Sequence, residues 1–106
     1  MTKNNIFSDL PKSIDKEVFE DILTRENIRI ERIISRGQCS PESDWYDQEE
    51  NEWVIMLSGS GTLLFEDERV IELKTGDYVL IPAHQRHKVV STDTEQPTIW
   101  LAVFFS

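Results

Sequence analysis

Short apolar segments separated by turn residues recur along the chain from Asn27 onward, and this pattern most constrains the fold. Most of the segments are rich in β-branched and aromatic residues, which favour strands. No long helical period occurs between them, so parallel βαβ units are excluded. Short strands at this spacing predict an all-β sandwich or barrel. The predicted strands cover residues 27–35, 52–58, 61–66, 69–73, 78–81, 87–91 and 98–105.

Several of the predicted strands are apolar at both parities. In the second of them, Trp53, Ile55 and Leu57 have one parity, and Val54 and Met56 have the other. A strand with one solvent-exposed face would alternate apolar and polar residues, so these strands should bury both faces. One face would line the barrel, and the other would meet a helix, a second sheet or another subunit. For a chain of 106 residues, whose stability margin is thin, this favours a two-fold homodimer.

The segment before the strands has a different periodicity. Ile14, Val18 and Ile22 lie four residues apart, as on one face of a helix. Ser13 is a suitable N-cap for it. The spacing therefore predicts a short helix at residues 13–24 that docks on the barrel.

The chain is short enough for one domain. Residues 1–12 are mostly polar and end in Leu10-Pro11, which predicts an N-terminal arm. Residues 13–106 are expected to form a single barrel domain that includes the helix. No internal repeat or low-complexity tract divides them.

Charge narrows the classes of partner. The chain has 11 Lys and Arg against 20 Asp and Glu, a formal net charge of −9, which argues against nucleic acid and anionic membranes. The N-terminus lacks the apolar core of a signal peptide, and no apolar run has the length of a membrane span, so a cytoplasmic location is expected. Cys39 is the only cysteine, which excludes an intrachain disulfide.

Two spaced motifs give the chain a family resemblance. Residues 76–87 match the pattern G-x5-P-x-G-x2-H-x3-N at Gly76, Pro82 and His87. Glu52 and Gly59 match the end of the pattern G-x5-H-x-H-x3-4-E-x6-G. With these motifs in this order, the chain resembles the cupin superfamily. The resemblance implies a double-stranded β-helix, or jelly-roll, barrel, here with the short N-terminal helix added.

The resemblance also implies a metal site in altered form. Metal-binding cupins hold one divalent ion with the two first-motif histidines, the glutamate and the second-motif histidine. Glu52 and His87 remain here, whereas the two first-motif histidine positions hold other residues. These positions fall at Trp45 and Asp47, or at Tyr46 and Gln48 if the spacing is one residue shorter.

Asp47 is the expected substitute ligand, and Gln48 is a weaker one. With Glu52 and His87, Asp47 would supply a site for iron, manganese, nickel or zinc. Oxygen ligands are poorer partners for these ions than imidazole, so weak or partial binding is expected. In the alternative interpretation, His87 is a hydrogen-bonded structural residue.

The remaining candidates would frame a ligand cavity. Trp45 and Tyr46 would stack on a ligand ring, or else pack as ordinary core. Met56 would line the cavity. His84 lies three residues before His87, so on one strand they would face opposite sides, and His84 reaches the cavity only if a turn intervenes. Three arginines are candidates to pair with a ligand carboxylate, although surface pairing is expected for each: Arg29, Arg32 and Arg86.

Three functions are compatible with these residues. The first is a binding barrel for a small polar molecule, with or without a divalent metal. The second is a metal-dependent isomerase, lyase or dioxygenase that uses Glu52 or His87 to move protons. The third is a metal-free structural or regulatory barrel filled by its own side chains.

Overall fold

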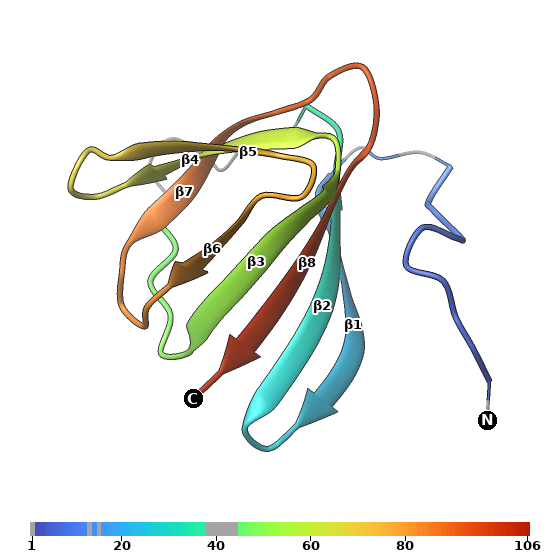
Figure 1. Ribbon diagram of the computed structural model, residues 1–106, viewed down its shortest axis with the longest axis horizontal. Coiled ribbons are helices and arrows are strands. Elements are labelled where there is room, and N and C mark those ends of the chain that lie inside the picture. The colour runs from blue at the N-terminus through green and yellow to red at the C-terminus, as the bar shows by residue number, and fades with distance from the viewer. Residues whose placement is uncertain (1, 13, 15, 38–44) are drawn as a thin grey trace.

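The computed structural model describes residues 2–12, 14, 16–37 and 45–106. Within them the chain forms two antiparallel sheets that face each other (Figure 1). The larger sheet has the strand order β1-β2-β8-β3-β6, and the smaller has the order β5-β4-β7. The strands are β1 (Val18–Arg25), β2 (Ile28–Ser35), β3 (Asn51–Ser58), β4 (Ser60–Phe65), β5 (Val70–Lys74), β6 (Tyr78–Ile81), β7 (His87–Thr92) and β8 (Thr98–Phe105).

The all-β prediction is confirmed. Each of the predicted strands from residue 27 onward is present, and each end differs from the prediction by at most one residue. No helix among the described residues is long and apolar enough to cross a membrane.

The helix predicted at residues 13–24 is wrong. Val18–Arg25 is strand β1, which pairs antiparallel with β2 from Val18 opposite Ile34 to Arg25 opposite Ile28. Apolar residues four apart also share one face of a strand, so this spacing does not separate the two structures. A helix of two to three turns is marginal alone, whereas the edge of β2 offers a full ladder of hydrogen bonds. The proposed N-cap, Ser13, lies outside the described residues.

The core lies between the two sheets. On β3 the predicted two-sided pattern is resolved by burial: Val54 and Met56 face the core and are almost fully buried, whereas Trp53, Ile55 and Leu57 are half-buried. The buried cluster contains Ile33, Val54, Met56, Leu63, Phe65, Leu73, Ile81, Val89, Trp100, Ala102 and Phe104.

Trp100 holds the two sheets in close contact. Its indole Nε1 donates to Ser35 Oγ over 3.1 Å, and the ring lies against Gly61 of β4. A Cβ atom at Gly61 would come 2.4 Å from Trp100 Cη2, so only glycine allows this approach. The indole therefore forms a flat wall inside the barrel.

The N-terminal arm is tied to the larger sheet through Arg32 of β2. The guanidinium donates to the carbonyls of Ile6 and Ser8 over 3.0 and 2.6 Å, and it pairs with Glu20 of β1. Arg32 is only 8% exposed. Arg32 therefore fastens the arm rather than facing a ligand.

Candidate functional site

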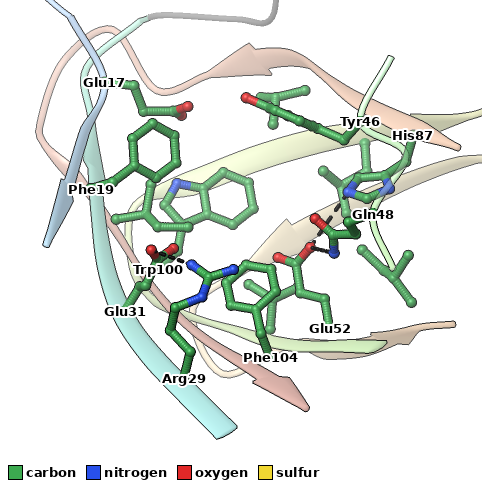
Figure 2. A pocket seen from close by; sticks show the side chains of 15 residues that line it. Glu17, Phe19, Arg29, Glu31, Tyr46, Gln48, Glu52, His87, Trp100 and Phe104 are labelled. Carbon is green, nitrogen blue, oxygen red and sulfur yellow. Dashed lines mark hydrogen bonds and ion pairs between the residues drawn. The ribbon is translucent and has the colours of Figure 1, made fainter. Parts of the chain in front are cut away.

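A cavity of about 270 Å³ opens between the two sheets, and both sheets contribute to it (Figure 2). Its floor is apolar, and polar groups gather on two opposite walls. The apolar lining residues are Phe19, Ile33, Val54, Leu63, Ile81, Val89, Trp100 and Phe104, and the polar ones are Glu17, Arg29, Glu31, Tyr46, Gln48, Glu52 and His87.

One wall is built around Glu52 and His87. Glu52 is on β3 of the larger sheet, His87 begins β7 of the smaller sheet, and both are buried. His87 Nε2 lies 3.5 Å from Glu52 Oε1, and Gln48 Nε2 donates to the same oxygen over 3.0 Å. His87 Nδ1 lies 2.9 Å from the carbonyl of Gln85, which orients the ring. The backbone of Tyr46 bridges that of His87, so the 45–48 segment runs across this wall.

The surroundings favour the charged form of His87. Burial lowers the pKa of His87, but the hydrogen bonds to Glu52 and to the Gln85 carbonyl, with the charge of Glu52, outweigh burial and raise it overall. Protonated imidazole donates from both nitrogens, and both face acceptors here. The Glu52 carboxyl therefore favours the protonated form of His87 on this buried wall.

The opposite wall carries an ion cluster centred on Arg29. Its guanidinium pairs with Glu31 on the same strand and with Glu50, the latter over 2.8 Å. It also lies 4.1 Å from the ring centroid of Phe104. Burial raises the pKa of Glu31, and Asp21 adds to the rise although Arg29 opposes it. Arg29 is thus already neutralised by two carboxylates.

Glu17 completes the rim of the cavity. It precedes β1, and burial raises its pKa to about 7. Its carboxyl makes no hydrogen bond or ion pair with any residue in the described part of the chain. Figure 2 shows Glu17 beside Phe19, with the carboxyl and Tyr46 directed toward one another across the cavity.

The structure places some of the site residues predicted from the sequence at the cavity and others away from it. Tyr46, Glu52 and His87 line the cavity, and so does Gln48, the weaker of the two proposed substitutes. Met56 is fully buried in the core and does not line the cavity.

The other three candidates lie outside the cavity. Trp45 has Lys88 Nζ 4.6 Å from its ring centroid. His84 does lie in a turn, with φ of 64°, but its Nδ1 faces Asp47 Oδ1 at 2.9 Å. His84 and Asp47 are both exposed, so this pair is a surface contact.

Several lining residues were missed because of the helix prediction. Glu17 and Phe19 lie two residues apart, so they fall on one face of a strand but not of a helix. A strand prediction would have placed both on the cavity side. Arg29, Glu31 and Ile33 are alternate residues of β2, so they share the face of the strand that lines the cavity.

The residues present do not fit the divalent metal centre that the resemblance implies. Over residues 2–12, 14, 16–37 and 45–106, no three His, Cys, Asp or Glu side chains are grouped as ligands. Glu52 and His87 are close, but Asp47 is turned to His84.

Comparison with known proteins agrees with this architecture. A family model described as "Cupin domain" matches residues 32–104. A crystal structure from Ralstonia eutropha, provisionally named as a mannose-6-phosphate isomerase, is 42% identical with a TM-score of 0.94, covering 100% of this chain and 99% of that one. No curated protein matches the chain.

Two more distant structures share the fold. An RmlC-like cupin from Desulfovibrio desulfuricans has 19% identity and a TM-score of 0.76, covering 98% of this chain and 96% of its own. An RmlC-like cupin with a double-stranded β-helix fold, from Methanocaldococcus jannaschii, has 20% identity and a TM-score of 0.71, covering 92% and 86%. The double-stranded β-helix predicted from the motifs is therefore confirmed.

Proposed function

The chain belongs to the cupin family, and on that premise we propose that its barrel binds one small polar molecule in the cavity between the sheets. The observation that carries the proposal is the pairing of a buried polar wall, Glu52 with His87, with a flat aromatic wall formed by Trp100 and Phe104. Ligand pockets combine a mostly apolar lining with a few placed polar groups in this way. A volume of about 270 Å³ suits a molecule of one ring.

The polar wall would recognise a ligand through complementary hydrogen bonds. Glu52 accepts from ligand hydroxyl or amine groups. His87 Nε2, whose contact with Glu52 is long at 3.5 Å, would share its proton with a ligand oxygen. Trp100 would pack against the apolar face of the ligand, since the absence of a side chain at Gly61 gives the indole room beside β4.

The proposal is tested by binding in solution with matched variants. Nuclear magnetic resonance with a library of single-ring polar compounds should shift signals of residues on the cavity walls. His87→Ala and Glu52→Gln should weaken each hit, whereas Asp47→Asn, at the exposed pair, should not. If no compound shifts the cavity signals, the barrel is better described as a structural one. If all three variants bind each hit alike, the Glu52–His87 wall does not recognise the ligand.

An isomerase acting on a sugar is a second candidate, favoured by the name of the Ralstonia protein. In an aldose–ketose conversion, the Glu52 carboxylate would take the proton from the carbon beside the carbonyl while His87 gives a proton to the carbonyl oxygen. Return of a proton to the former carbonyl carbon, and loss of one from the neighbouring hydroxyl, would complete the isomerisation.

The acidic lining weighs against a phosphorylated substrate. Arg29 is held by Glu31 and Glu50, which leaves it little charge to offer a phosphate. Incubation with mannose 6-phosphate and with mannose in deuterium oxide would detect exchange at the carbon next to the carbonyl. Exchange that is lost in Glu52→Gln would support the isomerase over simple binding.

We also propose that two chains associate through the outer face of the larger sheet. Strand register places six apolar side chains on this face, since Ile55 lies opposite Tyr78 and Leu101, and Trp53 lies opposite Leu80 and Val103. Tyr78 and Leu80 are 64% and 54% exposed. A contiguous apolar face of this kind is typical of a subunit interface.

A further inference from the structure

Among the residues that the structure describes, the charges around the cavity leave one carboxyl without a partner. Two of the lining carboxylates are matched by cations, since Glu31 pairs with Arg29 and Glu52 with His87. Glu17 has no such partner among the residues that the structure describes. A carboxylate taken partly out of water without a cation or hydrogen-bond donor is unfavourable, so this position favours a ligand that supplies one.

The surroundings of Glu17 are aromatic. Phe19 follows it on the same face of the chain, and Tyr46 lies across the cavity (Figure 2). Their side chains are substantially exposed, at 52% for Phe19 and 38% for Tyr46, so a ligand can reach them. A ring face attracts a cation through its quadrupole, which adds to the attraction of the carboxylate.

The same cavity already holds one cation in this manner. The Arg29 guanidinium lies over the Phe104 ring at 4.1 Å and pairs with Glu31 and Glu50. Elsewhere on the rim, Phe19 and Glu17 repeat this combination of an aromatic ring and a carboxylate, with no cation from the described part of the chain. An anionic ligand group would meet repulsion at either rim.

Building on the proposed binding function, we propose that the ligand is a small organic cation whose ammonium group pairs with Glu17 between Phe19 and Tyr46. Its apolar body would pack on Trp100, and its remaining polar groups would meet Glu52 and His87. The raised pKa of Glu17, about 7, is consistent with this assignment, since a bound ammonium stabilises the charged carboxylate.

Three probes of nearly equal size and different charge test the proposal. Benzylammonium, benzyl alcohol and benzoate are titrated separately into the full chain at about pH 8, where Glu17 is largely ionised. Binding is followed by nuclear magnetic resonance at millimolar probe concentration. We expect benzylammonium to bind about tenfold more tightly than benzyl alcohol, since a hydrogen bond to a charged group contributes at least that much. Benzoate should bind least.

Variants separate this proposal from the one on which it rests. Glu17→Gln should remove the preference, so that benzylammonium and benzyl alcohol bind about equally, whereas the exposed Glu26→Gln should leave the preference intact. Equal binding of the two probes, tightest binding of benzoate, or a preference that survives in Glu17→Gln overturns the cation assignment. If none of the probes shifts the cavity signals, the proposed binding function itself fails.

Discussion

Gly61 of β4 and Trp100 of β8 lie so close that a Cβ atom at residue 61 would be 2.4 Å from the indole. Trp100 is 3% exposed and cannot move aside without disturbing the core. We therefore expect Gly61→Ala to lower the free energy of unfolding by about 1–3 kcal/mol, as overpacking does. Urea unfolding measures this loss. Gly76→Ala is the comparison: its Cβ would meet no atom within 4 Å, but its φ of +94° adds strain, so only a strain cost of about 1 kcal/mol is expected.

The pairing of His87 with Glu52 predicts a pH-dependent stability. The pKa of His87 is raised in the folded chain, so its contribution is fully present below the unfolded pKa of about 6.5 and is lost as pH rises through the folded value. Urea unfolding from about pH 6 to about pH 9 should show this loss. Proton resonance titration should place the pKa of His87 above its ordinary value and show a fall in Glu52→Gln. If the pKa of His87 is the same in Glu52→Gln as in the natural chain, the pairing is contradicted.

Glu17 predicts a second change of stability with pH. Its pKa rises from 4.5 to about 7 on folding, so the folded chain binds this proton more tightly than the unfolded chain does. Stability is therefore lost as pH rises through that interval. Glu17→Gln should be more stable than the natural chain by about 1–2 kcal/mol at about pH 8 and show little gain at about pH 4.5. Thermal unfolding at both values checks this, and an equal gain at both would refute it.

Metal titration tests whether the site has only two protein ligands. Metal-stripped chain titrated by calorimetry with manganese, iron(II), nickel and zinc should show no tight stoichiometric binding, because Glu52 and His87 are the two donors that the described structure brings together. Any weak binding should disappear in His87→Ala and be unaltered in Asp47→Asn, whose carboxylate faces His84. Tight binding that depends on Asp47 would instead support the three-ligand site expected from the sequence.

The apolar outer face predicts a homodimer. Light scattering at micromolar concentration should give twice the chain mass of 12.4 kDa. Leu80→Asp should shift the mass to that of one chain, because a carboxylate at this exposed position of β6 would be buried in the interface. Val70→Asp is a matched control, since Val70 is 64% exposed on the smaller sheet. A monomeric natural chain would overturn the proposal.

The strands could be predicted from the sequence because strand and turn composition is local. The Glu52–His87 pair is instead implied by the resemblance to the two cupin motifs. Glycine and proline at fixed intervals allow turns and end strands, and the fold brings Glu52 and His87 onto facing strands. The first strand could not be predicted in this way. It pairs with β2, and both strands have a mixed composition. Such a pair gives no clear alternation of apolar and polar residues in the sequence.

Whether each of the remaining residues belongs to the site depends on the direction in which its side chain points. Asp47 and Gln48 are neighbours with similar chemistry, yet Gln48 donates to Glu52 and Asp47 faces His84. A shift of one residue along an extended segment reverses the side on which a chain points. The register is set by the backbone bridge between Tyr46 and His87, a contact between residues far apart in sequence. No local pattern encodes that contact.

Because Glu52 and His87 belong to different sheets, their ion pair also acts as a clasp between the two layers. The cavity cannot widen on this side unless the contact between Glu52 and His87 breaks. The pair therefore limits the width of the ligand as well as its polarity. Loss of the imidazolium proton would weaken this contact and allow the two sheets to separate transiently. We expect the barrel to be more selective for size in mildly acidic solution than in alkaline solution.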